Sequence, residues 1–317
     1  MSEDDIKKTA ITTPFGLFEY CQMPFGLRNA SQTFQRFVNQ IFGDLSFVTC
    51  YIDDILIYLI CKEDHVSHVK QVFERLTHHK LRISLDKCVF FVNEVNFLGC
   101  SISKNGIKPQ SSKVDVIRNF PLPNDYSQCR RLLGMAGFYR RFIPHFSDIV
   151  EPIQAVVNNY TTNKTFTFTK EAETAVNQMK DALTTAVTLA HQSPTSNIFQ
   201  LITDASGTAV GAVLHQLIDD QYHPIGFYSK KLTPAQKVYS AFDRELLAAY
   251  QAVLNFKSII DGQRVTLFVD HKPLVSAFHS RNPAKSDRQQ RHLAVLTEFL
   301  SDCIHVSGHE NVVADAL

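Results

Sequence analysis

Hydrophobic residues recur every three or four positions in two stretches of the first half of the chain, which is the period of a helix buried on one face. The first stretch predicts a helix over residues 30–42, with Asn29 as its N-cap and Gly43 at its end. The second begins near residue 65. Its predicted apolar face consists of Val66, Val69, Val72, Phe73 and Leu76.

Shorter patterns predict the other elements of this half. β-Branched residues on both sides of residues 52–54 predict two short strands. Residues 88–103 read CVFFVNEVNFLGCSIS and predict a hairpin with 93–94 at its turn. Residues 126–143 predict one helix that carries four arginines, and the polar run 158–164 is the best linker candidate.

The second half predicts a mixed sheet with helices on its faces. Three strand-like runs come first, and then strands alternate with a strong helix. The strand-like runs lie at 197–206, 209–216, 222–230, 264–270 and 303–308, the helix at 239–256, and a further helix begins at 311–317.

The composition indicates the general class of protein but does not indicate which molecules it binds. The 317 residues suggest two domains, and 44% hydrophobic residues are enough for sizeable cores. Because 32 basic residues face 31 acidic ones, global charge argues neither for nor against nucleic acid. Seven scattered cysteines without a CxxC pair indicate reduced thiols in an intracellular protein. The N-terminus has no signal-peptide core, and no run has the length of a membrane helix, so we expect no secretion and no membrane.

A zinc site is the first chemical possibility to weigh. Cys303, His305 and His309 lie close together in the sequence, but they lack a fourth ligand, so we set zinc aside.

Two adjacent aspartates, Asp53 and Asp54, interrupt an apolar run and are the first candidate site. Neighbouring side chains of a continuous strand point to opposite faces, so both acids can serve one site only if the chain turns there. We therefore predict a hairpin with these carboxylates at its tip, where they could hold Mg²⁺ together with substrate phosphates. The alternative is an ordinary exposed acidic turn.

The sequence around these aspartates resembles the reverse transcriptase of Ty3/gypsy-type LTR retrotransposons. The resemblance rests on four stretches in the family's order: KTAITTPFGLFEYCQMPFGLRNASQTFQRFVNQIF, YIDDILIY, KCVFFVNEVNFLGCSISKNGIKP and LLGMAGFYRRFIPHFS. It implies a polymerase palm in which Tyr51, Asp53 and Asp54 form the metal-bearing hairpin. FLGCSIS would be the primer grip. The residues implied in nucleotide or nucleic-acid binding are Phe25, Gly26, Arg28, Gln32, Tyr51 and the arginines Arg130, Arg131, Arg140 and Arg141 of a thumb helix, for which a merely solvated basic face is the alternative.

One carboxylate of the implied polymerase site has no counterpart. In this family the third metal-binding aspartate lies on a palm strand that precedes sequence like EDDIKKTAITTPFG. Here that sequence begins at residue 3, and no other aspartate lies between residues 6 and 43. We therefore expect an N-terminally truncated palm, without fingers or the first catalytic strand, whose polymerase chemistry is lost.

A second acidic set lies in the other half: Asp204, Glu245, Asp270 and Asp315. Glu245 is informative because its helical neighbours Ala241, Phe242, Ala248 and Ala249 are all apolar, which places its carboxylate on the inward side of its helix. A buried carboxylate needs a cation or a proton. The alternative is a set of four unrelated surface acids.

This half is similar to the retroelement ribonuclease H domain, through TDASGTAVGAVLHQ, YSKKLTPAQKVYSAFDRELLAAYQAV, VDHKPL, RQQRHLAVLTEF and HVSGHENVVADAL. The similarity implies that Asp204, Glu245, Asp270 and Asp315 hold two Mg²⁺ or Mn²⁺ ions and hydrolyse the RNA strand of an RNA–DNA hybrid. VDH replaces the commoner TDH, no tryptophan occurs, and the last motif ends with Leu317, so we expect a C-terminally clipped domain.

Together these patterns predict an α/β (α+β) fold: a partial right-hand polymerase palm (1–118), a thumb and connection (119–195) and a ribonuclease H-like mixed sheet with flanking helices (196–317). The expected function is cleavage of RNA in RNA–DNA hybrids within reverse transcription. The alternatives are a complete reverse transcriptase whose N-terminal part lies outside this chain, or a silent nucleic-acid-binding remnant. Expected partners are hybrid, primer-template, dNTP if the polymerase is competent, and other Pol or Gag segments. The expected location is the cytoplasm, in a virus-like particle, or the nucleus.

Overall fold

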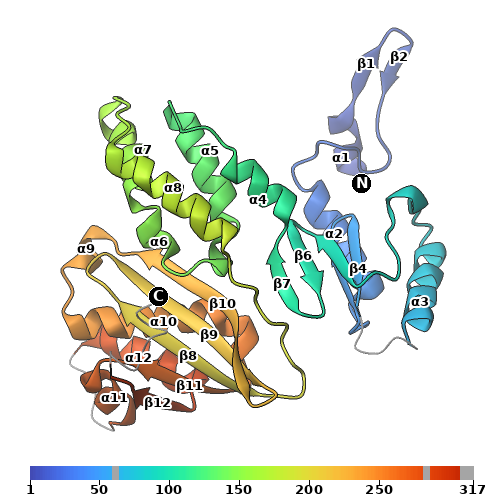
Figure 1. The fold of residues 1–317 in the computed structure, drawn as a ribbon. Helices are drawn as coiled ribbons and strands as arrows, with labels where there is room; N and C mark the ends of the chain where they lie inside the picture. The colour runs from blue at the N-terminus through green and yellow to red at the C-terminus, as the bar shows by residue number, and fades with distance from the viewer. Residues whose placement is uncertain (59–63, 281–285, 308–317) are drawn as a thin grey trace. The chain divides into compact units, whose positions relative to one another are not determined.

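The computed structural model describes residues 1–58, 64–280 and 286–307 (Figure 1). The chain divides into two compact units, Met1–Val92 and Asn93–Leu317, and we describe each by itself. None of the helices in the described ranges is long and apolar enough to cross a membrane.

The first unit has a small core between two helices and a hairpin. Helix α2 (Ala30–Phe42) ends at Gly43 as predicted, and it packs with α3 (His65–His78) and with the strands β3 (Val48–Tyr51) and β4 (Asp54–Ile57). The buried centre consists of Val38, Ile41, Phe42, Val72 and Leu76. Val66, predicted to face the core, is 64% exposed because it lies in the first turn of α3, beyond this small core.

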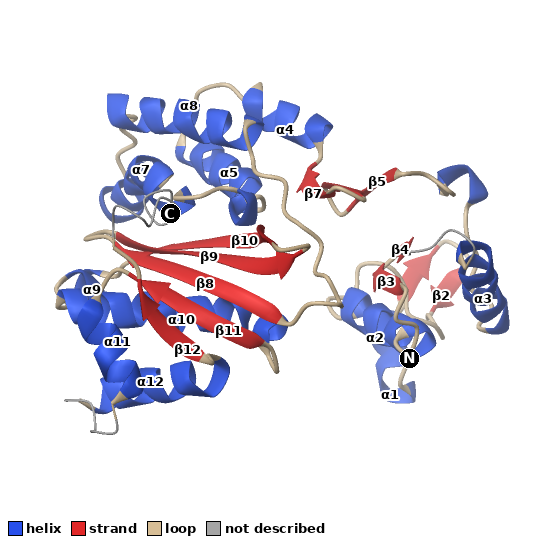
Figure 2. Cartoon of the chain, turned by 60° about the horizontal axis from the view of Figure 1, so that its bottom comes forward, coloured by secondary structure: helices blue, strands red, loops and turns tan. Residues whose placement is uncertain are grey.

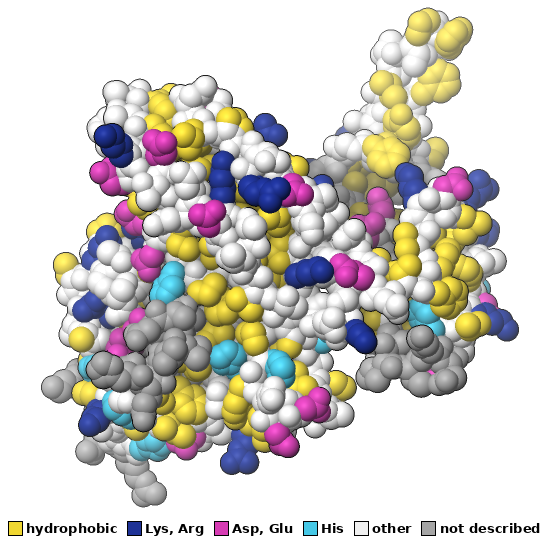
Figure 3. Space-filling view, in the orientation of Figure 1, with side chains coloured by type: hydrophobic (Ala, Val, Ile, Leu, Met, Phe, Trp, Pro, Cys, Tyr) yellow, Lys and Arg dark blue, Asp and Glu magenta, His cyan; other side chains and the backbone are white. Residues whose placement is uncertain are grey.

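The start of the first unit is a thin hairpin with apolar side chains on its surface. A short helix α1 (Glu3–Ile6) and a 3₁₀ turn (Lys7–Thr9) lead into β1 (Ile11–Thr13) and β2 (Gly16–Phe18), which pair with each other in a two-stranded sheet. Figure 3 shows hydrophobic side chains along this hairpin. Phe15 and Leu17 are among its exposed residues.

The predicted hairpin over 88–103 is wrong in its turn and in its first strand. A 3₁₀ turn (Leu85–Lys87) is followed by residues 88–92 without strand structure, whose aromatic rings contact α3 instead, with Phe90 against Phe73 and Phe91 against His65. In the second unit, Glu94 already belongs to β5 (Glu94–Phe97), which pairs with β6 (Cys100–Ser103). The turn lies at 98–99, where both residues have positive φ. Strand β7 (Gly106–Pro109) completes this three-stranded sheet.

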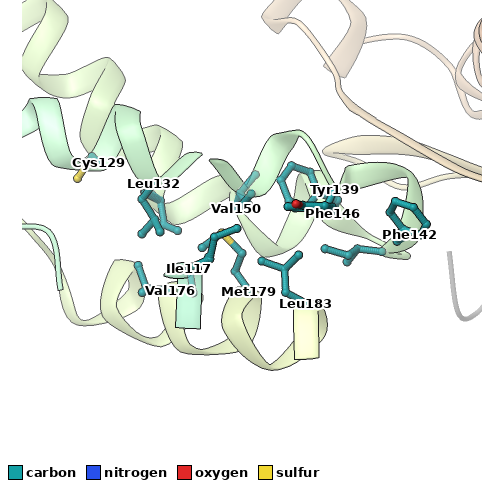
Figure 4. Close-up of a cluster of buried hydrophobic side chains, with 14 of the residues drawn as sticks. Ile117, Cys129, Leu132, Tyr139, Phe142, Phe146, Val150, Val176, Met179 and Leu183 are labelled. Carbon is teal, nitrogen blue, oxygen red and sulfur yellow. The ribbon is translucent and has the colours of Figure 1, made fainter. Parts of the chain in front are cut away.

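The second unit continues with a layer of helices around its own core (Figure 4). Its side chains come from α4 (Ser111–Arg118), α5 (Tyr126–Gly137), α6 (Phe146–Ile149), α7 (Glu151–Asn163) and α8 (Lys170–Thr184). Leu132, Phe142, Ile153 and Met179 are completely buried in this core.

Two predictions for this layer are corrected. The arginine-bearing stretch is not one helix, because α5 ends at Gly137 and residues Arg140–Phe142 form a separate 3₁₀ turn that lets Phe142 enter the core. The predicted linker 158–164 lies largely inside α7. Its Tyr160 ring stacks on Tyr126 at 4.6 Å between ring centroids, and buried Val156 and Val157 hold the helix to the core.

The predicted mixed sheet with flanking helices is confirmed (Figure 2). Strands β8 (Ile198–Ala205), β9 (Ala209–Ile218) and β10 (Gln221–Lys231) are antiparallel, whereas β11 (Arg264–Val269) is parallel to β8 and to β12 (Asp302–His305). The order is β10-β9-β8-β11-β12. Helix α10 (Ala241–Ile260) packs on β8, β9 and β11, with α11 (Lys272–His279) and α12 (Asp287–Phe299) beside it, while α9 (Pro234–Lys237) follows β10.

Edge strand β10 connects the sheet to the helical layer. The carbonyl of Ser229 accepts a hydrogen bond from Arg140, and its hydroxyl accepts one from the backbone of Ser147. An ion pair between Lys231 and Glu151 lies on the same strand. These contacts make residues 93–307 one continuous packed structure over the described part of the unit.

Candidate active site

Three carboxylates converge at one end of the mixed sheet. Asp204 lies near the end of β8, Asp270 directly follows β11, and Glu245 lies near the start of α10. One carboxylate oxygen of each lies within 4.8 Å of the others, and no other group of three or more acidic, histidine or cysteine ligands occurs in the described residues. Asp315, the fourth acid predicted for this site, lies outside the described residues.

Strand register explains why the two aspartates meet. Strands β8 and β11 are parallel neighbours, and Ile202 pairs with Phe268. Asp204 and Asp270 each lie two residues beyond this pair, so their side chains leave the sheet on the same side. The carboxyl ends of adjacent parallel strands thus bring two acids together that are 66 positions apart in the sequence.

Glu245 is the buried member of the cluster. Its side chain is on the inward face of α10, as its apolar neighbours predicted, and it is 6% exposed. Burial raises the pKa of Glu245 to about 8, and the nearby carboxylates of Asp270 and Asp204 add to this effect. Its Oε2 atom is buried and accepts no hydrogen bond from the described residues.

The donor set fits a hard divalent cation. Three carboxylates and no nitrogen or sulfur ligand are the oxygen-rich environment that Mg²⁺ and Mn²⁺ prefer. The buried oxygen of Glu245 lacks a donor, so a cation between the three carboxylates would satisfy it and relieve their mutual repulsion. These residues could therefore hold one or more such ions.

The hairpin predicted around the other aspartate pair is present in the first unit. Strands β3 and β4 pair antiparallel, with Tyr51 opposite Asp54, so Asp53 and Asp54 lie exposed at the tip. Ile52 has a φ of 51°, a conformation that β-branched residues rarely adopt. Both aspartates are outside any cluster of three ligands among the described residues.

Gln35 of α2 supports this tip, and the sequence analysis missed it. Its side-chain oxygen accepts a hydrogen bond from Ile52 N at 2.6 Å, and its nitrogen donates to Cys50 O at 3.1 Å. Gln32, the glutamine selected from the family motif, is exposed three residues earlier. Gln35 is identified by its two hydrogen bonds to the backbone of the β3–β4 hairpin. These bonds form between residues that are distant in the sequence, so no local sequence pattern could have indicated them.

The remaining predicted binding residues lie on the surface. Phe25 and Gly26 occupy a turn, where Gly26 has a φ of 90°, and Arg28 and Gln32 are exposed after it. Arg130 lies over the Tyr126 ring at 5.7 Å. Arg131 lies over Phe120 at 5.8 Å and Arg141 over Phe142 at 4.8 Å, whereas Arg140 donates to the Ser229 carbonyl.

Cys303 belongs to strand β12, and its side chain lies in the core of the sheet and its helices. It is 2% exposed, and burial raises the pKa of its thiol to about 12, which disfavours the thiolate that would bind a metal. His309 lies outside the described residues.

Comparison with known proteins assigns both halves of the chain. Residues 1–102 match the family model described as reverse transcriptase (RNA-dependent DNA polymerase). Residues 168–267 match the RNase H-like domain found in reverse transcriptase. The fold agrees, since a foamy viral protease-reverse transcriptase solved in complex with an RNA/DNA hybrid superposes with a TM-score of 0.81 at 21% identity, over 97% of this chain and 42% of that one.

Relatives of higher identity are transposon polyproteins. The Retrovirus-related Pol polyprotein from transposon 297 of Drosophila melanogaster is 37% identical over 319 residues, which cover 100% of this chain and 29% of that polyprotein. The Transposon Tf2-3 polyprotein of Schizosaccharomyces pombe is 33% identical, over 99% of this chain and 24% of that polyprotein. The chain thus spans less than a third of these relatives.

The fold and the matches define a reverse transcriptase domain joined to an RNase H-like domain. Over its whole length the chain is similar to part of the polyproteins of transposon 297 and transposon Tf2-3.

Proposed function

We propose that this chain hydrolyses the RNA strand of RNA–DNA hybrids with two divalent metal ions, Mg²⁺ or Mn²⁺. The observation that carries the proposal is the convergence of Asp204, Glu245 and Asp270 within 4.8 Å, with a Glu245 oxygen buried and without a donor in the described structure. Such a cluster is unfavourable for folding unless a cation or a proton neutralises it, which supports a role in binding metal.

The substrate class comes from the family. The foamy viral protease-reverse transcriptase of similar fold was solved with an RNA/DNA hybrid and, separately, with double-stranded DNA. An RNase H-like domain with a carboxylate cluster at its strand ends suits phosphodiester hydrolysis in such a duplex. Hybrid and primer-template are therefore the proposed partners of this chain.

Each acid has a proposed part in this chemistry. Asp204 and Asp270 would hold ions at the exposed side of the cluster, and Glu245 would hold one from the buried side, with Asp315 as the predicted fourth ligand. Bound Mg²⁺ would supply an activated water and stabilise charge on the leaving 3′ oxygen. The proposed boundaries remain 1–118 for the palm, 119–195 for thumb and connection, and 196–317 for the ribonuclease domain.

Cleavage of a labelled RNA strand in a hybrid tests the proposal. Asp204→Asn and Glu245→Gln should each lower the rate about a thousandfold, equivalent to about 4 kcal/mol of transition-state stabilisation. Asp53→Asn is the matched control, because it removes the same charge from the other unit and should leave cleavage unchanged. Equal damage by Asp53→Asn would show that one site, not two, is responsible. Tight hybrid binding without cleavage by the wild type would identify a silent binding remnant.

Templated DNA synthesis is a second candidate, favoured by the hairpin that presents Tyr51, Asp53 and Asp54. In the described structure these two carboxylates have no third ligand beside them. We therefore predict that the chain by itself does not extend a primer, and that the activity belongs to a longer polyprotein. Primer extension with dNTPs by this chain, abolished by Asp53→Asn, would contradict the prediction.

A further inference from the structure

Arg244 joins the two segments that carry Asp204 and Glu245. It directly precedes Glu245 in the first turn of α10, and its Nη1 atom donates a hydrogen bond of 2.8 Å to the carbonyl oxygen of Ser206. Ser206 lies two residues after Asp204, at the beginning of the turn between β8 and β9. One side-chain hydrogen bond therefore links the helix that carries Glu245 to the turn that directly follows the strand of Asp204.

The turn that Arg244 holds is rigid in itself. The Ser206 hydroxyl accepts hydrogen bonds from the backbone of Thr208 at 3.1 Å and of Ala209 at 2.9 Å. On the other side of the turn, Thr208 Oγ1 donates to Asp148 Oδ1 at 3.1 Å. Because the turn is braced in this way, fixing the Ser206 carbonyl also fixes the end of β8 that carries Asp204.

The first turn of α10 is likewise held in place. Ser240 caps it by accepting a hydrogen bond from Asp243 N at 3.1 Å. The carboxylate of Asp243 accepts hydrogen bonds from Arg288 at 2.9 Å and Gln289 at 3.0 Å, both on α12. Arg244 thus extends from a fixed helix start to a rigid turn, which is the geometry of a clamp.

We propose that Arg244 is a positioning residue of the acidic site, which holds Asp204 and Glu245 at the separation that a divalent cation needs. The inference rests on the proposed metal-dependent function of this site. Arg244 Nε is buried and makes no hydrogen bond to a described residue, so this edge of the guanidinium is closed to solvent.

Charge and geometry predict opposite effects when the guanidinium is removed. Electrostatics alone predicts that Arg244→Met tightens cation binding, because a positive charge next to the site is lost. The clamp predicts weaker binding, because the two carboxylates are no longer held together. Loss of a residue that orients metal ligands lowers metal affinity about 10- to 100-fold, which exceeds the expected electrostatic gain in a partly solvated site.

The experiment measures Mn²⁺ affinity by electron paramagnetic resonance of the free ion. The Mn²⁺ that still binds to the Asp204→Asn variant is bound at other sites, and this amount is subtracted. Arg244→Met should weaken the remaining binding about 10-fold. Arg264→Met is the matched control, since it removes the same side chain from the first residue of β11, at the opposite end of the sheet, and should leave the affinity unchanged.

A second readout follows the turn directly in metal-free protein. The backbone amides of Thr208 and Ala209 each donate a hydrogen bond to the Ser206 hydroxyl. Their hydrogen exchange should accelerate about 10-fold in Arg244→Met and remain unchanged in Arg264→Met. If Arg244→Met does not fold, Arg244→Lys decides the question. It keeps the charge and the aliphatic stem but loses the fork that reaches Ser206, and it should still weaken Mn²⁺ binding.

Two outcomes would overturn the inference: unchanged Mn²⁺ affinity in Arg244→Met, or tighter affinity. Unchanged affinity together with a raised KM for hybrid would show that Arg244 contacts a phosphate instead. The proposed function fails separately. A wild type that binds Mn²⁺ at this site but cleaves no hybrid refutes the ribonuclease and leaves the clamp to be decided by affinity. A wild type that cleaves hybrid while Arg244→Met keeps full affinity refutes the clamp alone.

Discussion

Replacing Glu245 by glutamine should stabilise the metal-free protein, and the gain should grow with pH. Glu245 is 6% exposed, and its pKa is raised from the usual 4.5 to about 8 by burial and by Asp270 and Asp204. At a pH between these two pKa values, Glu245 is protonated in the folded protein and deprotonated in the unfolded chain. The free energy of unfolding therefore falls as pH rises through this window, and glutamine, which does not titrate, removes that loss.

The magnitude follows from the width of the window. From 4.5 to pH 7 the interval is about 2.5 units, and at about 1.4 kcal/mol per unit the wild type loses about 3 kcal/mol that Glu245→Gln retains. For a unit that spans Asn93–Leu317, this corresponds to a difference in Tm of about 6–12 °C. The difference should vanish below pH 4.5, where Glu245 is protonated in both states.

Scanning calorimetry in EDTA between pH 4 and 8 measures this difference. Glu298→Gln is the control, because Glu298 is exposed on α12 and outside the cluster, and its Tm should follow the wild type at every pH. Added Mg²⁺ should raise the wild-type Tm far more than that of Glu245→Gln. A gain that is independent of pH, or a loss of stability in Glu245→Gln near pH 7, would refute the assigned cause.

Three further predictions concern packing and the hairpin tip. Gly106→Ala should lower the free energy of unfolding in urea by about 3 kcal/mol, since Gly106 has a φ of 125° and a Cβ would lie 2.3 Å from the Leu189 carbonyl oxygen. Gly134→Ala is the control: Gly134 lies in the interior of α5 with open space around it, so this change should raise the free energy of unfolding by about 0.5–1 kcal/mol. Equal effects of the two substitutions would refute this prediction. Gln35→Ala should weaken the β3–β4 tip by about 1–2 kcal/mol, seen as faster exchange of the Ile52 amide, and unchanged exchange would deny Gln35 its supporting role. Exposed Cys21 should react with a thiol reagent in the native protein while Cys303, whose pKa burial raises to about 12, does not; labelling of Cys303 at a similar rate would contradict its burial.

Local sequence correctly predicted the elements whose pattern and packing agree. Helix α10 has small and apolar residues on the face that meets the sheet, and the strands β8, β9 and β11 are apolar enough to be buried, so periodicity alone found them. The same periodicity placed Glu245 on an inward face before any fold was known.

Elements held by distant contacts were not predictable in this way. Residues 158–163 are rich in Asn and Thr, which are poor helix formers, yet they continue α7 because Val156 and Val157 enter the core. Residues 88–92 are strong strand formers, yet they form no strand, because their rings pack on α3.

The candidate site divides in the same manner. Acids at the ends of two buried strands and on the inner face of a helix are local features, so Asp204, Glu245 and Asp270 could be recognised as unusual from the sequence. Their approach to within 4.8 Å, the pKa of Glu245 near 8 and the reach of Arg244 to Ser206 depend on which strands are neighbours and how deeply the helix packs. These properties could not be predicted from local sequence, because the energy of a charge depends on its distance from other charges and on its desolvation, and both arise between residues that are far apart along the chain.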